Sequence, residues 1–548
     1  MSGPPHFIGV DVGTGSVRAG VFDANGQLLA HASHDIQLFQ DTPDHAEQSS
    51  ADIWQAVCKT TRAAITKASV APQTIVGIGF DATCSLVVIG ADGTGLPVGV
   101  SGEADRDIIV WLDHRATDQA KRINQSGHRV LKYVGGVISP EMETPKLLWL
   151  KENLPETYQS ARHFFDLVDF LSWKATGSTA RSMCTVTCKW TYMAHEKAWD
   201  ATYFEGIGLG DLSKDNFARI GADIVEPGTP LAQGLTQDAA DALGLVPGTP
   251  VAAGLIDAHA GGVGAMTGDT DVTSNLVYVF GTSACTMASS ERPHFIPGVW
   301  GPYHSAMVPG LWLNEGGQSS AGAAMERLLA LHPAAVGAAG AAKQSSQSLP
   351  DYLAALTVER APHLSEAAYL AGTLLVIPDF LGNRAPHADP EARAIIAGLG
   401  MDQDLESLIA LYVAGLLGIG YGLRQIIETS GASGATIKSV TVIGGAGRHP
   451  LIAQLLADCT GLPVIHPEQP EPVLLGASML GASASGSVPN LNAAMSKMSS
   501  PGDTIAPTHG AITALHNTRF SVFESLQKAA QVLKKPTSTE AFLGHAEA

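Results

Sequence analysis

The chain has 548 residues, of which 45% are hydrophobic and 16% charged, so it is too long for one core and too apolar to be disordered. We therefore expect a globular protein with two large domains. Its formal net charge of −19 disfavours a nucleic-acid partner, although nucleotides remain possible ligands because Mg²⁺ and backbone N–H groups neutralise phosphates.

The first 80 residues alternate between strands and a helix. We predict strands at residues 7–12, 17–22, 27–30 and 75–80, and a helix at 49–68. Asp23-Ala24-Asn25-Gly26 has the turn chemistry of a hairpin between the second and third strands. This alternation is typical of an α/β lobe.

A second set of similar elements begins near residue 270. We predict strands at 274–280, 311–313 and 439–443, and helices at 319–329, 404–430 and 450–460. Residues 333–349 are expected to be a loose insertion, and residues from about 487 to the end a helical appendage. The sequence thus predicts an N-terminal lobe at 1–265 and a C-terminal lobe at 266–548, with the boundary near 258–272.

We expect a cytoplasmic protein without a membrane segment. The N-terminus lacks a basic region followed by an apolar one, and the uncharged run at 408–423 has 16 residues, short of the roughly 20 that span a bilayer. Six cysteines are scattered, and Cys184 and Cys188 have no second pair of ligands for zinc. Free thiols in a reducing compartment fit this pattern.

Three glycine-rich turns follow apolar strands. In Asp11-Val12-Gly13-Thr14-Gly15-Ser16, small residues let backbone N–H groups converge on an oxyanion, and Asp11 beside them predicts a bridging Mg²⁺. Gly281-Thr282-Ser283 repeats the pattern. Gly444-Gly445-Ala446-Gly447 is neither a Walker A loop nor a Rossmann fingerprint, and its glycines would let an adenine ring approach the backbone. The alternatives are an ordinary glycine hairpin for the first turn and a tight strand–helix turn for the third.

Asp257 follows the apolar stretch 251–256 and precedes small residues. A carboxylate there can accept a hydroxyl proton as a general base, or cap a helix, and both roles can coexist. His259 is expected to have a structural or supporting role.

The order of these motifs resembles the two phosphate loops and the adenosine loop of the actin-like ATPase superfamily. Within it, residues 7–485 resemble the FGGY family of carbohydrate kinases, as do Phe380–Pro386 and Asp389–Arg393. The resemblance implies two actin-like (ribonuclease H-like) α/β lobes with a nucleotide cleft between them, ATP and Mg²⁺ as cofactors, and Asp257 as the base. It also implies that residues 281–283 approach the terminal phosphates and that residues 444–447 hold the adenosine.

The resemblance also narrows the range of sugars that the protein is expected to phosphorylate. At Asp81–Ser85 the chain lacks the Arg-Glu of glycerol kinases and the Met-His of xylulose kinases, and resembles ribulokinases. The sugar-binding residues it implies are Thr83, Cys84, Trp111, Asp113, Lys189, Asp257 and Glu315. The nucleotide-binding residues are Asp11, Gly13, Thr14, Gly15, Ser16, Arg18, Gly281, Thr282, Ser283, Gly444, Gly445, Ala446 and Gly447, with Asp11 also the metal residue.

We therefore predict an ATP-dependent kinase that converts D-ribulose to D-ribulose 5-phosphate. L-ribulose, ribitol and xylulose stay open as substrates, and an actin- or chaperone-like ATPase is the alternative from another class. Lys189 could also be a surface lysine, Arg384 a structural ion-pair partner, and Arg18 a surface hairpin arginine. The sequence does not set the oligomeric state, and a homodimer remains open.

Overall fold

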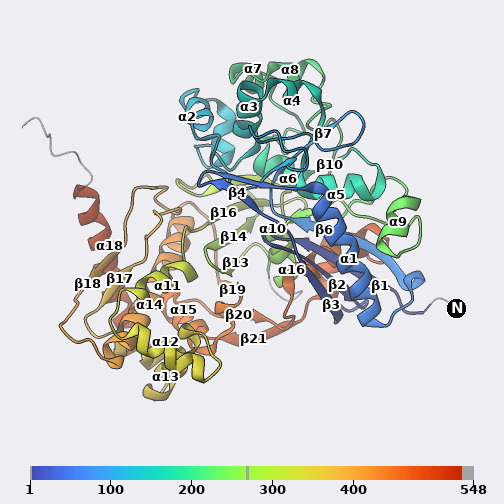
Figure 1. Cartoon of the computed structure of the whole chain (residues 1–548). Coiled ribbons are helices and arrows are strands. Elements are labelled where there is room, and N and C mark those ends of the chain that lie inside the picture. Colours follow the sequence, from blue (N-terminus) through green and yellow to red (C-terminus); the bar gives the residue numbers. More distant parts are fainter. Residues whose placement is uncertain (1–2, 267–270, 534–548) are drawn as a thin grey trace, which may run out of the picture.

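The computed structural model describes residues 3–266 and 271–533. Two sheets built on the same plan form its two lobes (Figure 1). In the first, β3 (Leu28–Asp35), β2 (Ser16–Phe22), β1 (His6–Val12), β6 (Ile75–Ala82) and β12 (Leu255–Ile256) lie side by side in this order. In the second, the same places are taken by β16 (Trp312–Gln318), β14 (Ala284–Ser290), β13 (Asn275–Phe280), β19 (Ser439–Ile443) and β20 (Val464–Pro467).

The strand directions repeat as well. β1 pairs antiparallel with β2 and parallel with β6, and β13 pairs antiparallel with β14 and parallel with β19. Each lobe therefore presents a hairpin turn beside the carboxyl end of a parallel strand, where ligands of α/β sheets bind. The predicted two-lobed, actin-like α/β fold is confirmed by this repeat and by the solved structures described below.

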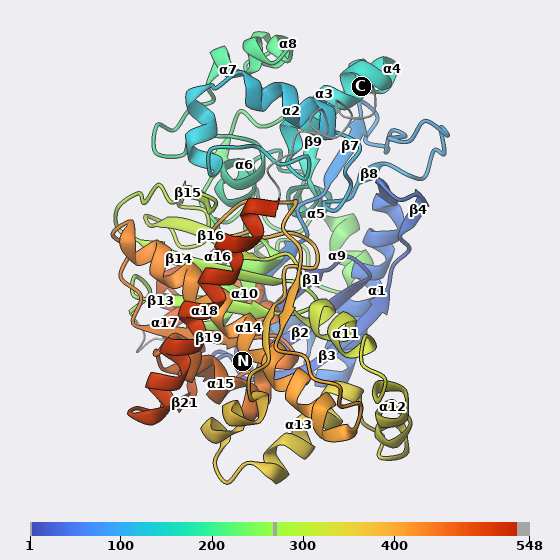
Figure 2. The same ribbon diagram turned by 90° about the vertical axis from the view of Figure 1, so that its left-hand side faces the viewer.

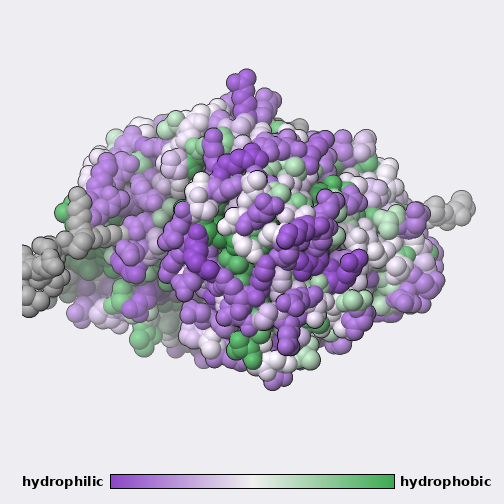
Figure 3. Space-filling model, turned by 90° about the horizontal axis from the view of Figure 1, so that it is seen from above, coloured by the Kyte–Doolittle hydropathy of each residue, from purple (hydrophilic) through white to green (hydrophobic). Residues whose placement is uncertain are grey.

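Each lobe carries an outer part. On the first, helices such as α2 (Thr117–Gln125), α3 (Glu143–Asn153) and α6 (Met183–Lys189) surround a second sheet that contains β7 (Leu86–Gly90) and β9 (Ala161–Asp166), at the top of Figure 1. On the second, α12 (Ala335–Gln344) and α13 (Leu349–Arg360) lie at the bottom, with α11 (Gly322–Ala330) above them. The face shown in Figure 3 is mainly hydrophilic, with hydrophobic residues in small separate patches.

Two helices are exchanged between the halves of the chain. α16 (Pro472–Ala484), from the C-terminal half, packs on β1 and β6 of the first sheet and crosses α10 (Asp257–Ala265) at the centre of the molecule (Figure 2). The contact is backbone to backbone, since a Cβ added to Gly9, Gly79 or Gly476 would overlap a carbonyl oxygen of the facing segment. The absence of side chains at these places brings α16 against the sheet.

This close approach predicts a large stability effect. Gly79→Ala is expected to lower the free energy of unfolding by about 1–3 kcal/mol, because its Cβ would overlap the carbonyl oxygen of Ala477. Gly340→Ala in α12 is the control, since its Cβ would meet nothing within 4 Å and alanine favours an exposed helix by up to about 1 kcal/mol. Denaturant titration of both variants measures the difference. Equal free energies of unfolding for the two variants would show that β6 and α16 can move apart to accept the new methyl group without a loss of stability.

The 28-residue helix α14 (Leu405–Ala432) is long and apolar enough to cross a membrane. However, 72% of its most apolar 18-residue window is buried inside the protein, among the core residues of the second lobe. This is the position of a core helix, and it contains the run at 408–423 that the sequence analysis finds too short for a membrane span.

Two predictions about elements were wrong, and a third was incomplete. Residues 333–349 contain the helix α12, which its alanines favour. The strand predicted at 311–313 continues through Glu315 as β16, and the following helix begins only at Gly322. The C-terminal segment holds α17 (Leu491–Met498) and α18 (Ala511–Leu533), but also β21 (Pro501–Ile505), which pairs with β20 of the second sheet. Residues 267–270, in the predicted lobe boundary, and 534–548 lie outside the described residues.

Candidate active site

A cleft of about 560 Å³ is lined by residues of both halves of the chain. It brings together most of the residues expected to bind ligands: Asp11, Gly13, Thr14, Gly15, Ser16, Arg18, Thr83, Cys84, Trp111, Lys189, Asp257, Ser283 and Glu315. It also contains Arg384, for which a ligand contact and a structural ion pair are both open from the sequence, and three residues that the sequence does not predict as ligands, Glu141, Cys285 and Trp300.

Both phosphate-type turns are closed by a backbone hydrogen bond, but the first turn is one residue longer than the second. The N–H of Gly13 donates to the carbonyl of Ser16, and the N–H of Gly281 donates to the carbonyl of Ser283, both at 3.0 Å. A Cβ at Gly15 would meet nothing within 4 Å, and its φ is not in the left-handed region, so neither packing nor backbone conformation requires glycine there. Gly281 and Thr282 are exposed and do not line the cleft themselves, whereas Ser283 does.

The turn after β19 combines two kinds of glycine. Gly444 has φ +100° and Gly447 packs against Val442, so the tight-turn interpretation holds for both. Gly445 is exposed, and a Cβ there would meet nothing within 4 Å. Ile443, just before the turn, lines both the main cleft and a second hollow of about 500 Å³ that includes Arg448, just after it. The backbone of Ala446 lies in a 3₁₀ turn, Ala446–Arg448.

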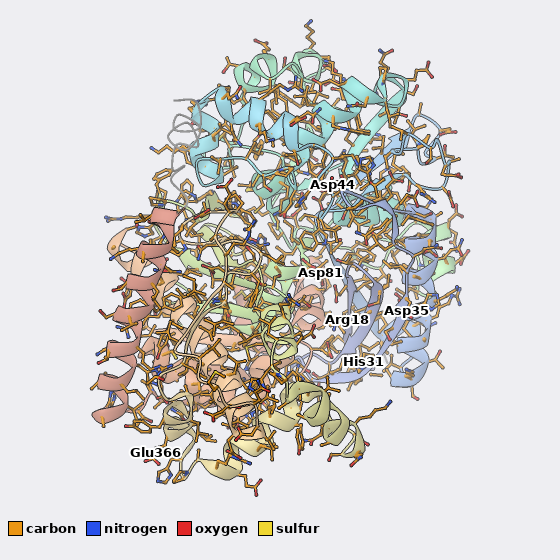
Figure 4. The ribbon with its side chains drawn as sticks, turned by 60° about the vertical axis from the view of Figure 1, so that its left-hand side comes forward. Arg18, His31, Asp35, Asp44, Asp81 and Glu366 are labelled. Carbon is orange, nitrogen blue, oxygen red and sulfur yellow. The ribbon has the colours of Figure 1, made fainter. Side chains whose placement is uncertain are left out.

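The carboxylates of Asp11, Asp81 and Asp257 lie close together beside the first turn. Asp11 accepts hydrogen bonds from Arg18, whose Nη1 also donates to Glu471 at 2.8 Å. Asp81 is fully buried, and within residues 3–266 and 271–533 no group donates to either of its oxygens. Burial, then the charges of Asp11 and Asp257, raise its pKa well above the usual value. Figure 4 shows Asp81 and Arg18 close together near the centre of the molecule.

These residues fit a divalent cation that takes few protein ligands. Among the described residues, no group of three or more His, Cys, Asp or Glu side chains could hold a metal by itself. Mg²⁺ commonly uses only one or two carboxylates together with water and substrate phosphates. The orphaned oxygens of Asp81 beside Asp11 suit such an ion.

Asp257 begins α10 and faces the same cleft. Its Oδ1 accepts the N–H of Ala258 at 2.7 Å, so it supports the helix start and lines the cleft at once. Burial, followed by the charge of Asp11, raises the pKa of Asp257 to about 6. The carboxylate is therefore mostly ionised at neutral pH, yet basic enough to accept a proton.

The cleft lining also carries three charged side chains, those of Lys189, Glu315 and Arg384. Lys189 ends α6 and is only 6% exposed, which excludes a surface lysine. Its Nζ lies 5.2 Å from the ring centroid of Trp300, and the Arg384 guanidinium lies 5.4 Å from the same ring. No carboxylate lies within ion-pair distance of Arg384 among the described residues, so the expected alternative of a structural ion pair does not hold.

The same charges set the state of Glu315. Burial alone would raise its pKa, but Lys189, His259 and Arg384 together lower it to about 2. Glu315 is thus a carboxylate at any physiological pH and a hydrogen-bond acceptor only.

One predicted sugar residue is misplaced. Asp113 is fully buried and does not line the cleft; its oxygens accept hydrogen bonds from the Arg115 guanidinium and from the N–H of Ala46. Its role is to hold Arg115, which also pairs with Glu47. Neighbouring Trp111 does reach the cleft, where its Nε1 donates to Thr14 Oγ1 at 2.9 Å.

The residues that were missed had weak sequence signals. Glu141 stands in a loop without a motif, and only the fold brings its carboxylate within 3.6 Å of His114. Trp300 lies in the segment Gly298-Val299-Trp300-Gly301-Pro302-Tyr303, whose aromatic residues were the available signal.

Comparison with known proteins decides the family. The models of the N-terminal and C-terminal domains of the FGGY family of carbohydrate kinases match residues 6–264 and 276–485. The chain belongs to this family. An FGGY carbohydrate kinase domain-containing protein of Homo sapiens is 47% identical over 513 residues, which cover 92% of each chain. A D-ribulokinase of Saccharomyces cerevisiae is 38% identical over 512 residues, covering 87% of this chain and 72% of that one.

Solved structures of FGGY kinases share the fold. A xylulose kinase from Lactobacillus acidophilus superposes with a TM-score of 0.78 at 19% identity, covering 98% of this chain and all of that one. A Plasmodium falciparum glycerol kinase gives 0.75 at 16% identity, covering 96% and 98%. The protein is thus a sugar kinase, for which ATP is the expected phosphate donor, and the alternative of an actin- or chaperone-like ATPase is not supported.

Proposed function

We propose that this FGGY kinase phosphorylates a ketopentose, converting D-ribulose to D-ribulose 5-phosphate at the expense of MgATP. The observation that carries the proposal is the gathering of Asp257, Lys189 and Glu315 in one cleft with the glycine turn at residues 13–16. The similarity to a D-ribulokinase of Saccharomyces cerevisiae supports the choice of sugar.

The proposed reaction is a direct phosphoryl transfer. Asp257 takes the proton of the C5 hydroxyl; that oxygen forms a bond to the γ-phosphorus, and the bond between this phosphorus and the ADP oxygen breaks. The hydroxyl groups of Thr14 and Ser283, which both line the cleft, stabilise the charge on the transferred group. Mg²⁺, when bound near Asp11 and Asp81, would neutralise phosphate charge.

The remaining polar groups suit an open-chain polyol. A sugar hydroxyl both donates and accepts, and the cleft offers Lys189 and Arg384 as donors and Glu315 as an acceptor. Trp300 supplies an apolar face beside both cations, against which the carbon chain of a sugar can pack.

A panel of sugars tests this proposal. ATP consumption is measured with D-ribulose, L-ribulose, D-xylulose, ribitol and no sugar, and D-ribulose is expected to give the highest kcat/KM. A higher value for another sugar would correct the substrate and leave the kinase. Equal turnover with and without every sugar would overturn the kinase itself.

We assign the adenosine to the turn at residues 444–447, because Gly445 leaves its backbone open. Gly445→Val is expected to raise the KM for ATP about tenfold, since the added side chain would occupy the space of a ring against the backbone. The KM for the sugar and the unfolding midpoint should stay near the native values, because no neighbour lies within 4 Å of the new Cβ. A native KM for ATP would place the adenosine elsewhere.

A further inference from the structure

A buried histidine lies directly behind the cleft. His259 is the third residue of α10 and is 0% exposed. Its Nδ1 lies 3.1 Å from Sγ of Cys184 on α6, and its Nε2 lies 3.5 Å from Oε2 of Glu315 on β16. Three elements thus contribute one continuous row of polar side chains, Cys184–His259–Glu315, which ends on a residue that lines the cleft.

The contact between His259 and Glu315 is isolated. Both Nε2 and Oε2 are shut off from solvent, and in the described part of the chain neither has a hydrogen-bond partner; the two atoms face each other at an ion-pair distance of 3.5 Å. A buried carboxylate oxygen is costly unless a donor faces it. His259 is the group placed to supply that donor.

Cys184 decides which ring nitrogen carries the proton toward Glu315. The N–H of Ile256 donates to Sγ at 3.4 Å, and the sulfur also contacts Nδ1 of His259 and the thiol of Cys188. Either the thiol donates to Nδ1 of a neutral ring, or Nδ1–H of the imidazolium donates to a thiolate; in both cases Nε2 carries a hydrogen that points at Glu315. The remaining tautomer would set the lone pair of Nε2 against a carboxylate that Lys189 keeps ionised.

We propose that His259 is a positioning residue for the sugar: its Nε2–H holds Oε2 of Glu315, so that Oε1 is presented to the cleft as an acceptor for a sugar hydroxyl. Cys184 orients the imidazole. The inference rests on the proposed role of Glu315 in sugar binding, but not on which ketopentose is the substrate.

The placement also links two parts of the site. Asp257 and His259 belong to the first turn of α10, so one helix sets the base and the group that orients the acceptor. α10 is fixed in turn by its glycine crossing with α16, where a Cβ on Gly476 would overlap the carbonyl of Ala260. A shift of this helix would move both functions together.

Two substitutions of nearly the same size separate this role from packing. The amide nitrogen of His259→Gln reaches about as far as Nε2, whereas that of His259→Asn reaches only the place of Nδ1. With the sugar of highest kcat/KM in the panel, His259→Asn is expected to raise the KM for sugar about 10- to 100-fold, the usual cost of losing a hydrogen bond to a charged group. His259→Gln should stay within about threefold, and both variants should keep the native KM for ATP.

A double-mutant cycle with Glu315→Gln completes the test. If His259 acts through Glu315, His259→Asn should change the KM for sugar by less than about twofold once Glu315 is replaced. Equal effects of the Asn and Gln variants, a native KM for His259→Asn, or additive effects in the cycle would each overturn the inference. A native KM for Glu315→Gln alone would instead remove Glu315 from the proposed sugar site, and the inference with it.

Cys184 offers a second route if His259→Asn does not fold. Cys184→Ser keeps a donor toward Nδ1 and Cys184→Ala removes it. The alanine variant should raise the KM for sugar above that of the serine variant by about threefold or more. Identical values for the two would overturn the inference.

Discussion

Asp257→Asn is expected to lower kcat by about 10²- to 10⁴-fold, the usual contribution of a general base. The asparagine Oδ1 can still accept the N–H of Ala258, so α10 should keep its start and ATP should still bind. Steady-state turnover and nucleotide binding by calorimetry measure the two effects. Asp118→Asn, on the exposed face of α2, is the control for the loss of one negative charge. A variant rate within about tenfold of the native one would show that another group takes the proton.

The pKa of Asp257 adds a pH dependence to this prediction. The pKa is raised to about 6, and only the ionised form accepts a proton, so kcat/KM for the sugar should fall as pH drops below about 6. Above that value the base is ionised and this limb should level off. The pH profile of the native enzyme measures the limb, and its midpoint should be absent from the residual activity of Asp257→Asn.

Lys189→Met is the second large effect. The side chains are similar in length and both are unbranched, but methionine offers no donor, so kcat/KM for the sugar is expected to fall about 100-fold. The KM for ATP should change little. Lys121→Met, at a site where the lysine is 69% exposed, serves as the matched control. A kcat/KM for the sugar equal to that of the native enzyme would take Lys189 out of the sugar site.

The sequence predicts site residues best where they directly follow a strand in the chain. The turns at 13–16 and 281–283 and the aspartate at 257 each follow an apolar strand, so strand and ligand loop are read from one short segment. Their meeting in one cleft required the repeated sheet order.

Residues that depend on tertiary pairing were harder to predict. Asp113 and Asp257 differ locally only in the Asp-x-Arg spacing of Asp113. Arg115 binds Asp113, whereas no arginine of the described residues forms an ion pair with Asp257. Glu141 and Trp300 gain their place only when the two halves of the chain come together. The sequence predicts that the strand before Glu315 ends at residue 313, because Gly316 and Gly317 are typical of turns; in the structure the strand continues to Gln318.

The exchange of α10 and α16 has a consequence for synthesis on the ribosome. The sheet around Gly9 and Gly79 is covered by a helix that is translated only after most of the second lobe. A nascent chain that has emerged as far as β12 therefore still exposes part of the face that α16 will bury, a state that chaperones recognise and that aggregates readily. The lobe that is translated first is thus completed only after residues 472–484 have been made.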